Sequence, residues 1–168
     1  MSQSEDTEYA VSILRKMCID MRLENASILD KYTDAQLALM YNGIGPDSFP
    51  DWLVEVLDNA APELAPSCMI HDVEWLESNG TKKTFKESND RLRRNGKITA
   101  NYMYGFWNIK RYIVRWDARV MAKACQKFGF GIWVSYATRC FWKIPKRRIY
   151  APCNCPMAIK LLDFNILD

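Results

Sequence analysis

The sequence SCMIHDVEWL, residues 67–76, is the centre of the fold prediction, and it contains His71, the only histidine of the 168-residue chain. Asn79-Gly80 breaks the pattern after it, so we expect a helix over residues 67–76. Adjacent side chains on a helix diverge by about 100°. One helix can therefore aim the imidazole of His71 at a substrate and the carboxylate of Asp72 at a metal ion beside it.

Helical periodicity continues on the N-terminal side of this segment. We expect helices over residues 8–23, 34–41 and 50–60. Thr33 is suited to cap the second of these helices, and Asn42-Gly43 is suited to end it. A shorter helix is expected next, with either Asn25 or Ser27 as its N-cap.

Two further helices are expected on the C-terminal side. Thr84 and Glu87 have the spacing of a capping box, which predicts a helix that begins at Thr84 and stops at Asn95-Gly96. A long amphipathic helix is expected over residues 98–127. Its apolar stripe consists of Tyr102, Phe106, Ile109, Ile113, Trp116, Val120 and Ala124. We interpret the aromatic part of this stripe, residues 102–116, as core.

The last segment, residues 132–168, is rich in tryptophan, tyrosine, isoleucine and proline. We expect Gly129 and Gly131 to end the long helix before it, and we expect the tail to form either a short hairpin or an irregular wrap. The fold class predicted for the chain is therefore mainly α, with residues 1–168 in a single domain.

The composition predicts a folded, soluble protein. Apolar residues make up 49% of the sequence and charged residues 26%, which is enough for a real core. No stretch approaches the roughly 18 uncharged apolar residues of a transmembrane helix. The N-terminal sequence Met1-Ser-Gln-Ser-Glu-Asp is polar and acidic, unlike a signal peptide, so we expect the chain to be cytoplasmic as synthesised.

Six cysteines lie at positions 18, 68, 125, 140, 153 and 155. In a chain of this length without a signal peptide, we expect reduced thiols rather than a disulfide framework. Cys153 and Cys155 form a C-x-C pair, but no second pair at ligand spacing and no nearby histidine accompany it. We therefore interpret these two cysteines as structural or incidental rather than as metal ligands.

Basic residues are concentrated in two clusters. The first consists of Lys82, Lys83, Lys86, Arg91, Arg93, Arg94 and Lys97. The second, Lys143, Lys146, Arg147 and Arg148, lies beside the aromatic residues Phe141, Trp142 and Tyr150. Such clusters suit an anionic surface, either lipid headgroups or nucleic acid, and a simple solvated basic face remains an alternative. No recognised nucleic-acid-binding motif is present, so nucleic acid is not the expected partner.

Two motifs together resemble the phospholipase A2 superfamily, in particular the short viral and bacterial (phage-associated) phospholipase A2-like domains. Tyr41-Asn-Gly43-Ile-Gly45 resembles the calcium-binding loop Tyr-x-Gly-x-Gly, and residues 67–72 resemble the catalytic helix Cys-Cys-x-x-His-Asp. The segment 85–92 resembles the second helix of that family. The resemblance covers residues 41–95 and implies a core of two antiparallel helices with a calcium loop.

This resemblance implies a function and a set of roles. His71 would act as the general base on a water molecule in the calcium-dependent hydrolysis of a phospholipid acyl ester. Asp72 and the carbonyls of Tyr41, Gly43 and Gly45 would hold Ca²⁺. The partner would be a phospholipid membrane surface, which the chain would reach by delivery to a membrane or by packaging in a phage particle.

The sequence departs from the family pattern behind the histidine. Where the family places an aspartate that orients the imidazole, this chain has Asn89, with Asp90 one residue further on. A tyrosine position of the family, four residues after the histidine, is occupied by Trp75, whose indole donates but does not accept a hydrogen bond. These departures leave open a second hypothesis, a catalytically degenerate member that serves as a binding or structural module.

Overall fold

The computed structural model describes residues 3–41 and 61–138, and all regular structure within them is helical. The α-helices are α1 (Gln3–Asp20), α2 (Asp34–Met40), α4 (Ala65–Leu76), α5 (Lys82–Met103), α6 (Ile109–Phe128) and α7 (Phe130–Ala137). Two 3₁₀ helices, η1 (Ala26–Lys31) and η2 (Pro62–Leu64), precede α2 and α4 respectively. The predicted mainly α class is therefore confirmed for the described residues. None of these helices is long and apolar enough to cross a membrane.

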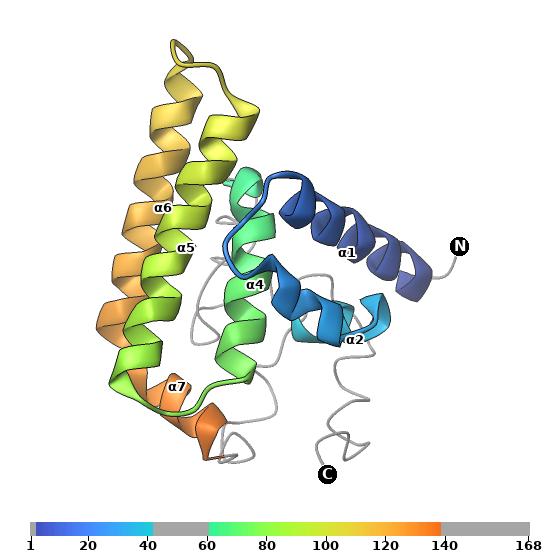
Figure 1. Cartoon of the computed structure of the whole chain (residues 1–168), viewed down its shortest axis with the longest axis vertical. Helices are drawn as coiled ribbons and strands as arrows, with labels where there is room; N and C mark the ends of the chain where they lie inside the picture. Colours follow the sequence, from blue (N-terminus) through green and yellow to red (C-terminus); the bar gives the residue numbers. More distant parts are fainter. Residues whose placement is uncertain (1–2, 42–60, 139–168) are drawn as a thin grey trace.

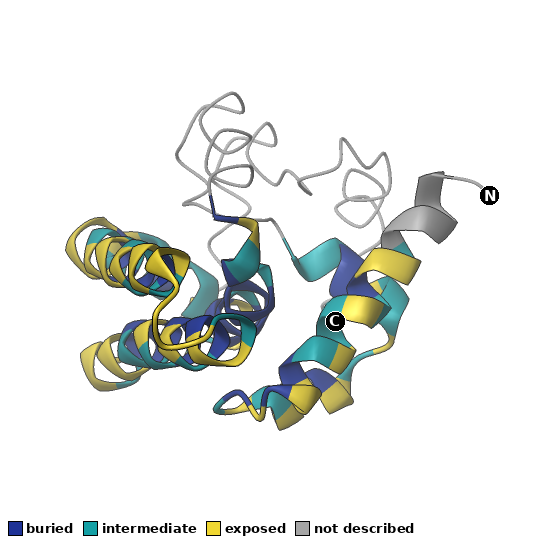
Figure 2. Ribbon diagram, turned by 90° about the horizontal axis from the view of Figure 1, so that it is seen from above, coloured by how far each residue is buried: buried dark blue, intermediate teal, exposed yellow. Residues whose placement is uncertain are grey.

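Helix α4 is the centre of the fold, and nine of its twelve residues are buried. It lies between an N-terminal layer of α1, η1 and α2 on one side and the long antiparallel hairpin of α5 and α6 on the other (Figure 1). Seen from above, the exposed residues of α5 and α6 face away from α4 (Figure 2). The predicted helix over residues 67–76 is thus confirmed, and it begins two residues earlier than expected.

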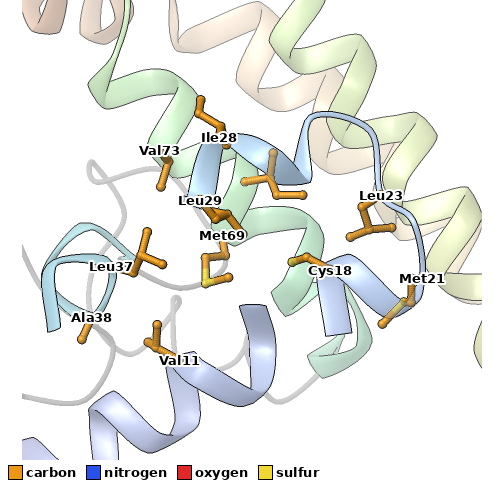
Figure 3. Close-up of a cluster of buried hydrophobic side chains, with 11 residues drawn as sticks. Val11, Cys18, Met21, Leu23, Ile28, Leu29, Leu37, Ala38, Met69 and Val73 are labelled. Carbon is orange, nitrogen blue, oxygen red and sulfur yellow. The ribbon is translucent and has the colours of Figure 1, made fainter. Parts of the chain in front are cut away.

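Three apolar clusters hold α4 in place. In the first, Val11 of α1, Leu37 of α2 and Met69 of α4 point toward one another (Figure 3). The second joins the start of α4 to α5 and α6 and consists of Ala61, Leu64, Cys68, Leu92, Ala100, Val114, Ala118 and Ala122. The third joins the end of α4 to the start of α5, to α6 and to α7 through Trp75, Phe85, Cys125 and Trp133. Successive turns of α4 therefore contact different neighbours.

Polar contacts add specificity to this packing. The carboxylate of Glu74, buried on α4, accepts hydrogen bonds from Arg91 of α5 and from the amide of Asn25, at 2.6 Å for the latter. The hydroxyl groups of Ser67 and Thr99 lie 3.2 Å apart, also between α4 and α5. A buried carboxylate is stable only when it is paired and hydrogen-bonded, so Glu74 fixes the register of α4 against its neighbours.

The prediction of one continuous helix over residues 98–127 is wrong, because the structure has two helices there. Helix α5 runs on to Met103, the chain turns at residues 104–108, and α6 returns antiparallel. Tyr104 has extended backbone angles, and the side chain of Asn108 caps α6 by accepting a hydrogen bond from the backbone of Lys110. An N-cap acceptor satisfies an otherwise unpaired amide, so this turn begins a new helix rather than a kink.

The predicted stop at Asn95-Gly96 is also wrong, because both residues lie inside α5 and are buried. A Cβ atom on Gly96 would lie 2.4 Å from the Cβ of Ala118 on α6. The glycine therefore permits the two helices to approach closely instead of ending one of them. The amide of Asn95 bonds to both the backbone N–H and the carbonyl of Glu24, at 2.8 and 3.1 Å.

Of the other predicted helix boundaries, some are confirmed and some are displaced. Thr33 caps α2 in a full capping box with Gln36, as the sequence indicates. The expected helix over 8–23 is found as Gln3–Asp20, and the short helix begins after Asn25 as a 3₁₀ turn. Thr81 rather than Thr84 caps α5. The expected helix over 50–60 and the Asn42-Gly43 stop lie outside the described residues.

Two expectations for the C-terminal region are corrected. The start of the tail is neither a hairpin nor irregular, because Phe130–Ala137 forms α7; the tail beyond residue 138 lies outside the described residues. Gly129 ends α6 as expected, whereas Gly131 lies within α7. The described cysteines Cys18, Cys68 and Cys125 are buried and form no disulfide bond, as expected, and Cys140, Cys153 and Cys155 lie outside the described residues.

Candidate functional site

His71 lies in the middle of α4, and its ring faces α5. The side chain is almost fully buried. Its Nε2 atom lies 2.9 Å from the Oδ1 atom of Asn89, a hydrogen bond between the two antiparallel helices. The antiparallel arrangement of α4 and α5 therefore brings together two residues that the family resemblance places in one site.

The orientation of the Asn89 amide determines the protonation of the imidazole. The Nδ2 atom of Asn89 donates a hydrogen bond of 2.9 Å to the carbonyl oxygen of Phe85, one helical turn earlier. This leaves Oδ1, an acceptor, to face His71, so Nε2 must carry the hydrogen. A neutral imidazole has one N–H, and its Nδ1 atom therefore holds a lone pair that can accept a proton.

Asp72 places a carboxylate beside this lone pair. Its Oδ1 atom lies 3.9 Å from Nδ1 of His71, and 14% of its side chain is exposed. It also lies close to α6: burial raises the pKa of the Cys125 thiol to about 12, and the negative charge of Asp72 contributes to the same shift. The carboxylate thus sits at the edge of the buried interface, next to the basic nitrogen of the only histidine.

The imidazole is packed against an aromatic group on its other side. The rings of His71 and Trp75 are 5.0 Å apart between centroids and tilted by 46°. Trp75 in turn contacts Phe85 at 5.7 Å and Trp133 of α7 at 5.9 Å. Ring packing of this kind restricts rotation about the side-chain bonds, so Trp75 helps to hold the His71 ring in one orientation.

Gly129 provides the space that Trp75 occupies. A Cβ atom at this position would lie 2.2 Å from the Cη2 atom of the Trp75 ring, which is closer than any real contact. The sequence predicts that Gly129 ends a helix and places Phe85 within the segment 85–92, and it predicts no contact of Gly129, Phe85 or Trp133 with Trp75. Of these, only Phe85 has a detectable signal, because it lies one helical turn before Asn89.

Asp90 does not contact His71 through any described hydrogen bond or ion pair. It is rotated from Asn89 by about 100° around α5. Its charge acts instead on Arg94, whose pKa is raised chiefly by its hydrogen bond to Glu24 and to a smaller extent by Asp90. Of the two candidates to orient the histidine, the structure therefore pairs Asn89 with the imidazole.

Two of the expected calcium ligands lie in the described part of the chain, Asp72 and Tyr41. Tyr41 follows α2, and its side chain packs against both the first and the second apolar cluster, which meet on α4. The chain therefore leaves α2 beside the helix that carries Asp72. Gly43 and Gly45 lie outside the described residues. A carboxylate and backbone carbonyls are hard oxygen donors of the kind that Ca²⁺ takes in proteins.

Comparisons of the chain with models of protein families, with curated proteins and with solved structures found no match. The candidate site is therefore defined by the local motifs and by the geometry around His71. That geometry consists of a buried histidine with one nitrogen paired to Asn89, a carboxylate beside the other nitrogen, and an aromatic ring against its face.

Proposed function

We propose that this chain hydrolyses an acyl ester of a phospholipid in a calcium-dependent reaction. His71 is the general base, Asp72 and the carbonyls of Tyr41, Gly43 and Gly45 hold Ca²⁺, and the substrate is presented by a membrane surface. The observation that carries the proposal is the pairing of Nε2 of His71 with Oδ1 of Asn89 at 2.9 Å, since it leaves Nδ1 to accept a proton.

The chain's own residues account for the movement of the proton. Nδ1 of His71 takes a proton from a water molecule as the water oxygen bonds to the ester carbonyl carbon. The imidazolium then returns that proton to the leaving alcohol oxygen as the ester C–O bond breaks. Throughout, Oδ1 of Asn89 accepts the Nε2–H and keeps the ring in position. When bound, Ca²⁺ supplies positive charge that polarises the carbonyl and stabilises the oxyanion.

Asn89 distinguishes this site from one with an acid behind the histidine. A free amide can rotate and donate to the imidazole, which would put the hydrogen on the wrong nitrogen. In this chain the hydrogen bond from Nδ2 to the Phe85 carbonyl opposes that rotation. An amide stabilises an imidazolium less than a carboxylate does, so the proposed enzyme is expected to be slower than one with an aspartate at this position.

The same substitution favours a second candidate function. A degenerate phospholipase A2-like protein would keep the helical pair and the cation ligands but would serve as a binding or structural module. The neutral Asn89 behind the histidine is the observation that supports this candidate. The two candidates differ in a single measurable property, turnover.

Release of fatty acid from mixed phospholipid vesicles tests the proposal. Purified full-length chain is assayed with millimolar Ca²⁺ and with excess chelator, and Asp72→Asn is compared with Asp90→Asn, a matched loss of carboxylate on the neighbouring helix. We expect calcium-dependent release that Asp72→Asn abolishes and Asp90→Asn retains. Calcium binding by calorimetry without any release would support the degenerate module instead.

A further inference from the structure

The outer face of α6 carries an apolar stripe that the structure leaves exposed. Ile109, Ile113, Trp116 and Val120 recur at helical spacing, with exposed fractions of 69%, 51%, 62% and 44%. The residues that α6 buries against the bundle, Val114, Ala118, Ala122 and Cys125, lie on the opposite side of the helix. The expectation that the stripe over residues 102–116 forms core is therefore wrong, because periodicity alone does not say which of two apolar faces points inward.

The stripe continues onto the turn between α5 and α6. This turn lies at the far end of the hairpin, away from the rest of the bundle (Figure 1). Trp107 is 92% exposed and Phe106 is 58% exposed, and their rings pack edge to face with centroids 5.0 Å apart. Exposed tryptophan on a projecting tip is typical of a group that enters the interfacial region of a bilayer.

A basic cavity of about 180 Å³ lies beside the stripe and is lined entirely by cations, Arg93, Arg94 and Lys97 of α5 and Arg115 and Arg119 of α6. Within the described residues, only Arg94 of these five pairs with a carboxylate, that of Glu24. The guanidinium of Arg115 donates to Asn101, and its buried Nε has no hydrogen-bond partner there. The other four cations have no carboxylate partner within the described residues, and an anionic ligand in the cavity would compensate their charge.

The hairpin of α5 and α6 is strongly basic as a whole, which also favours an anionic ligand. Residues 82–128 contain thirteen lysines and arginines but three aspartates and glutamates, a net charge of +10, whereas the full chain carries +3. Trp116 and Arg119 are three residues apart on α6 and therefore only about 60° apart around the helix. The apolar stripe and the basic cavity are neighbouring parts of one surface.

An anionic bilayer matches both halves of this surface. A nucleic acid would use the cations but would leave the apolar stripe and Trp107 exposed to water. A second copy of the chain would cover the stripe but would bring two hairpins of +10 together. A helix that pairs an apolar face with flanking basic residues lies in the plane of a membrane, where anionic headgroups compensate its charge.

We propose that the α5–α6 hairpin docks the chain onto anionic phospholipid membranes. Phosphate groups of the lipid bind in the cavity between Arg93, Lys97, Arg115 and Arg119, while Phe106, Trp107 and the stripe on α6 enter the interface. The proposal extends the proposed function, since it gives the chain a surface that holds it at a membrane, but docking requires neither calcium nor hydrolysis. It can therefore hold even where turnover is absent.

The test is flotation of the full chain with vesicles in the presence of chelator, so that calcium plays no part. Vesicles of phosphatidylcholine alone are compared with equimolar phosphatidylcholine and phosphatidylglycerol. We expect the chain to float with the anionic vesicles only, and binding to weaken as salt is added. His71→Gln should bind like wild type, so a failure of docking and a failure of hydrolysis are told apart.

Paired variants locate the surface. Arg115→Gln with Arg119→Gln, and separately Trp107→Ser with Trp116→Ser, should each weaken binding by roughly tenfold or more. Lys16→Gln with Arg22→Gln removes the same charge from exposed positions outside the hairpin, and Tyr9→Ser with Ile19→Ser removes exposed apolar residues from α1; both should bind normally. Arg115 is partly buried and the other seven substituted residues are exposed, so the variants should fold, which circular dichroism verifies.

Three outcomes would overturn the proposal. One is no flotation with anionic vesicles. The second is that the chain binds duplex DNA in the same buffer, and that Arg115→Gln with Arg119→Gln abolishes this DNA binding but leaves vesicle binding unaffected. The third is a dimer in light scattering that Trp116→Ser converts to a monomer, because the stripe would then be an interface between copies.

Discussion

The side-chain amide of Asn89 is hydrogen-bonded at both ends, and this fixes the tautomer of His71. Its Oδ1 lies 2.9 Å from Nε2 of His71, and its Nδ2 lies 2.9 Å from the carbonyl oxygen of Phe85. Because the carbonyl can only accept, the amide has one orientation that satisfies both bonds. The result is an imidazole with its hydrogen on Nε2 and a lone pair on Nδ1.

This tautomer can be measured directly. The chain has one histidine, so a sample labelled with ¹⁵N in histidine gives a single imidazole spin system. We expect ¹⁵N shifts and couplings above neutral pH that report a protonated Nε2 and an unprotonated Nδ1. A spectrum with the hydrogen on Nδ1 would contradict the assigned Asn89 orientation and remove the proposed base.

Replacing Asn89 by leucine should destabilise the fold. Asn89 is fully buried, and Asn89→Leu leaves the Nε2–H of His71 without a partner. We expect the free energy of unfolding to fall by about 1–3 kcal/mol. Urea denaturation measures it. Asp90→Asn, on the same helix and partly exposed, should change stability by no more than about 0.5 kcal/mol.

Gly129 should not tolerate a side chain. In Gly129→Ala the new Cβ would meet the Trp75 ring, which must shift away from His71 and Trp133. We expect a loss of about 1–3 kcal/mol, together with a changed near-ultraviolet circular dichroism spectrum. Gly131→Ala is the matched control, since a Cβ at that position meets nothing within 4 Å. Equal stability of the two variants would argue against the placement of Trp75.

Asp117 should make stability depend on pH. Burial, and then the nearby charge of Glu63, raise its pKa above the ordinary value of 3.8. A carboxyl group whose pKa is raised in the folded state adds to the free energy of unfolding while it is protonated, at low pH. This contribution is lost as the pH rises through the pKa of the folded state. Asp117→Asn should therefore melt at a higher temperature than wild type at pH 7. The difference in melting temperature between the two proteins should shrink as the pH falls toward 3.8. A difference that stays constant with pH would argue against a raised pKa of Asp117.

Local signals predicted those parts of the fold in which neighbouring residues decide the outcome. The helix around His71 and the cap at Thr33 depend on residues within one or two turns, and both are found. The continuation of α5 through Asn95 and Gly96 depends instead on partners far away in sequence, Glu24 and Ala118. A glycine that permits close packing looks the same in sequence as one that ends a helix.

The candidate site likewise has a part that the sequence predicts and a part that only the structure shows. The motif spacing suggested that residue 89 or 90 lies behind the histidine, and the structure places Asn89 there. The supports of Trp75 are Phe85, Gly129 and Trp133, which come from three other segments. No periodic pattern connects these positions to residue 75, so only the packing of α4 against α5, α6 and α7 reveals them.

The proposed role of His71 as the base in phospholipid hydrolysis is tested by comparing fatty-acid release by wild type and by His71→Gln under identical conditions. With millimolar Ca²⁺ and mixed phospholipid vesicles, wild type should release fatty acid, and the variant should be slower by a factor on the order of 10²–10⁴. No release by correctly folded wild type, or equal release by the two proteins, would show that His71 is not the base of such a reaction.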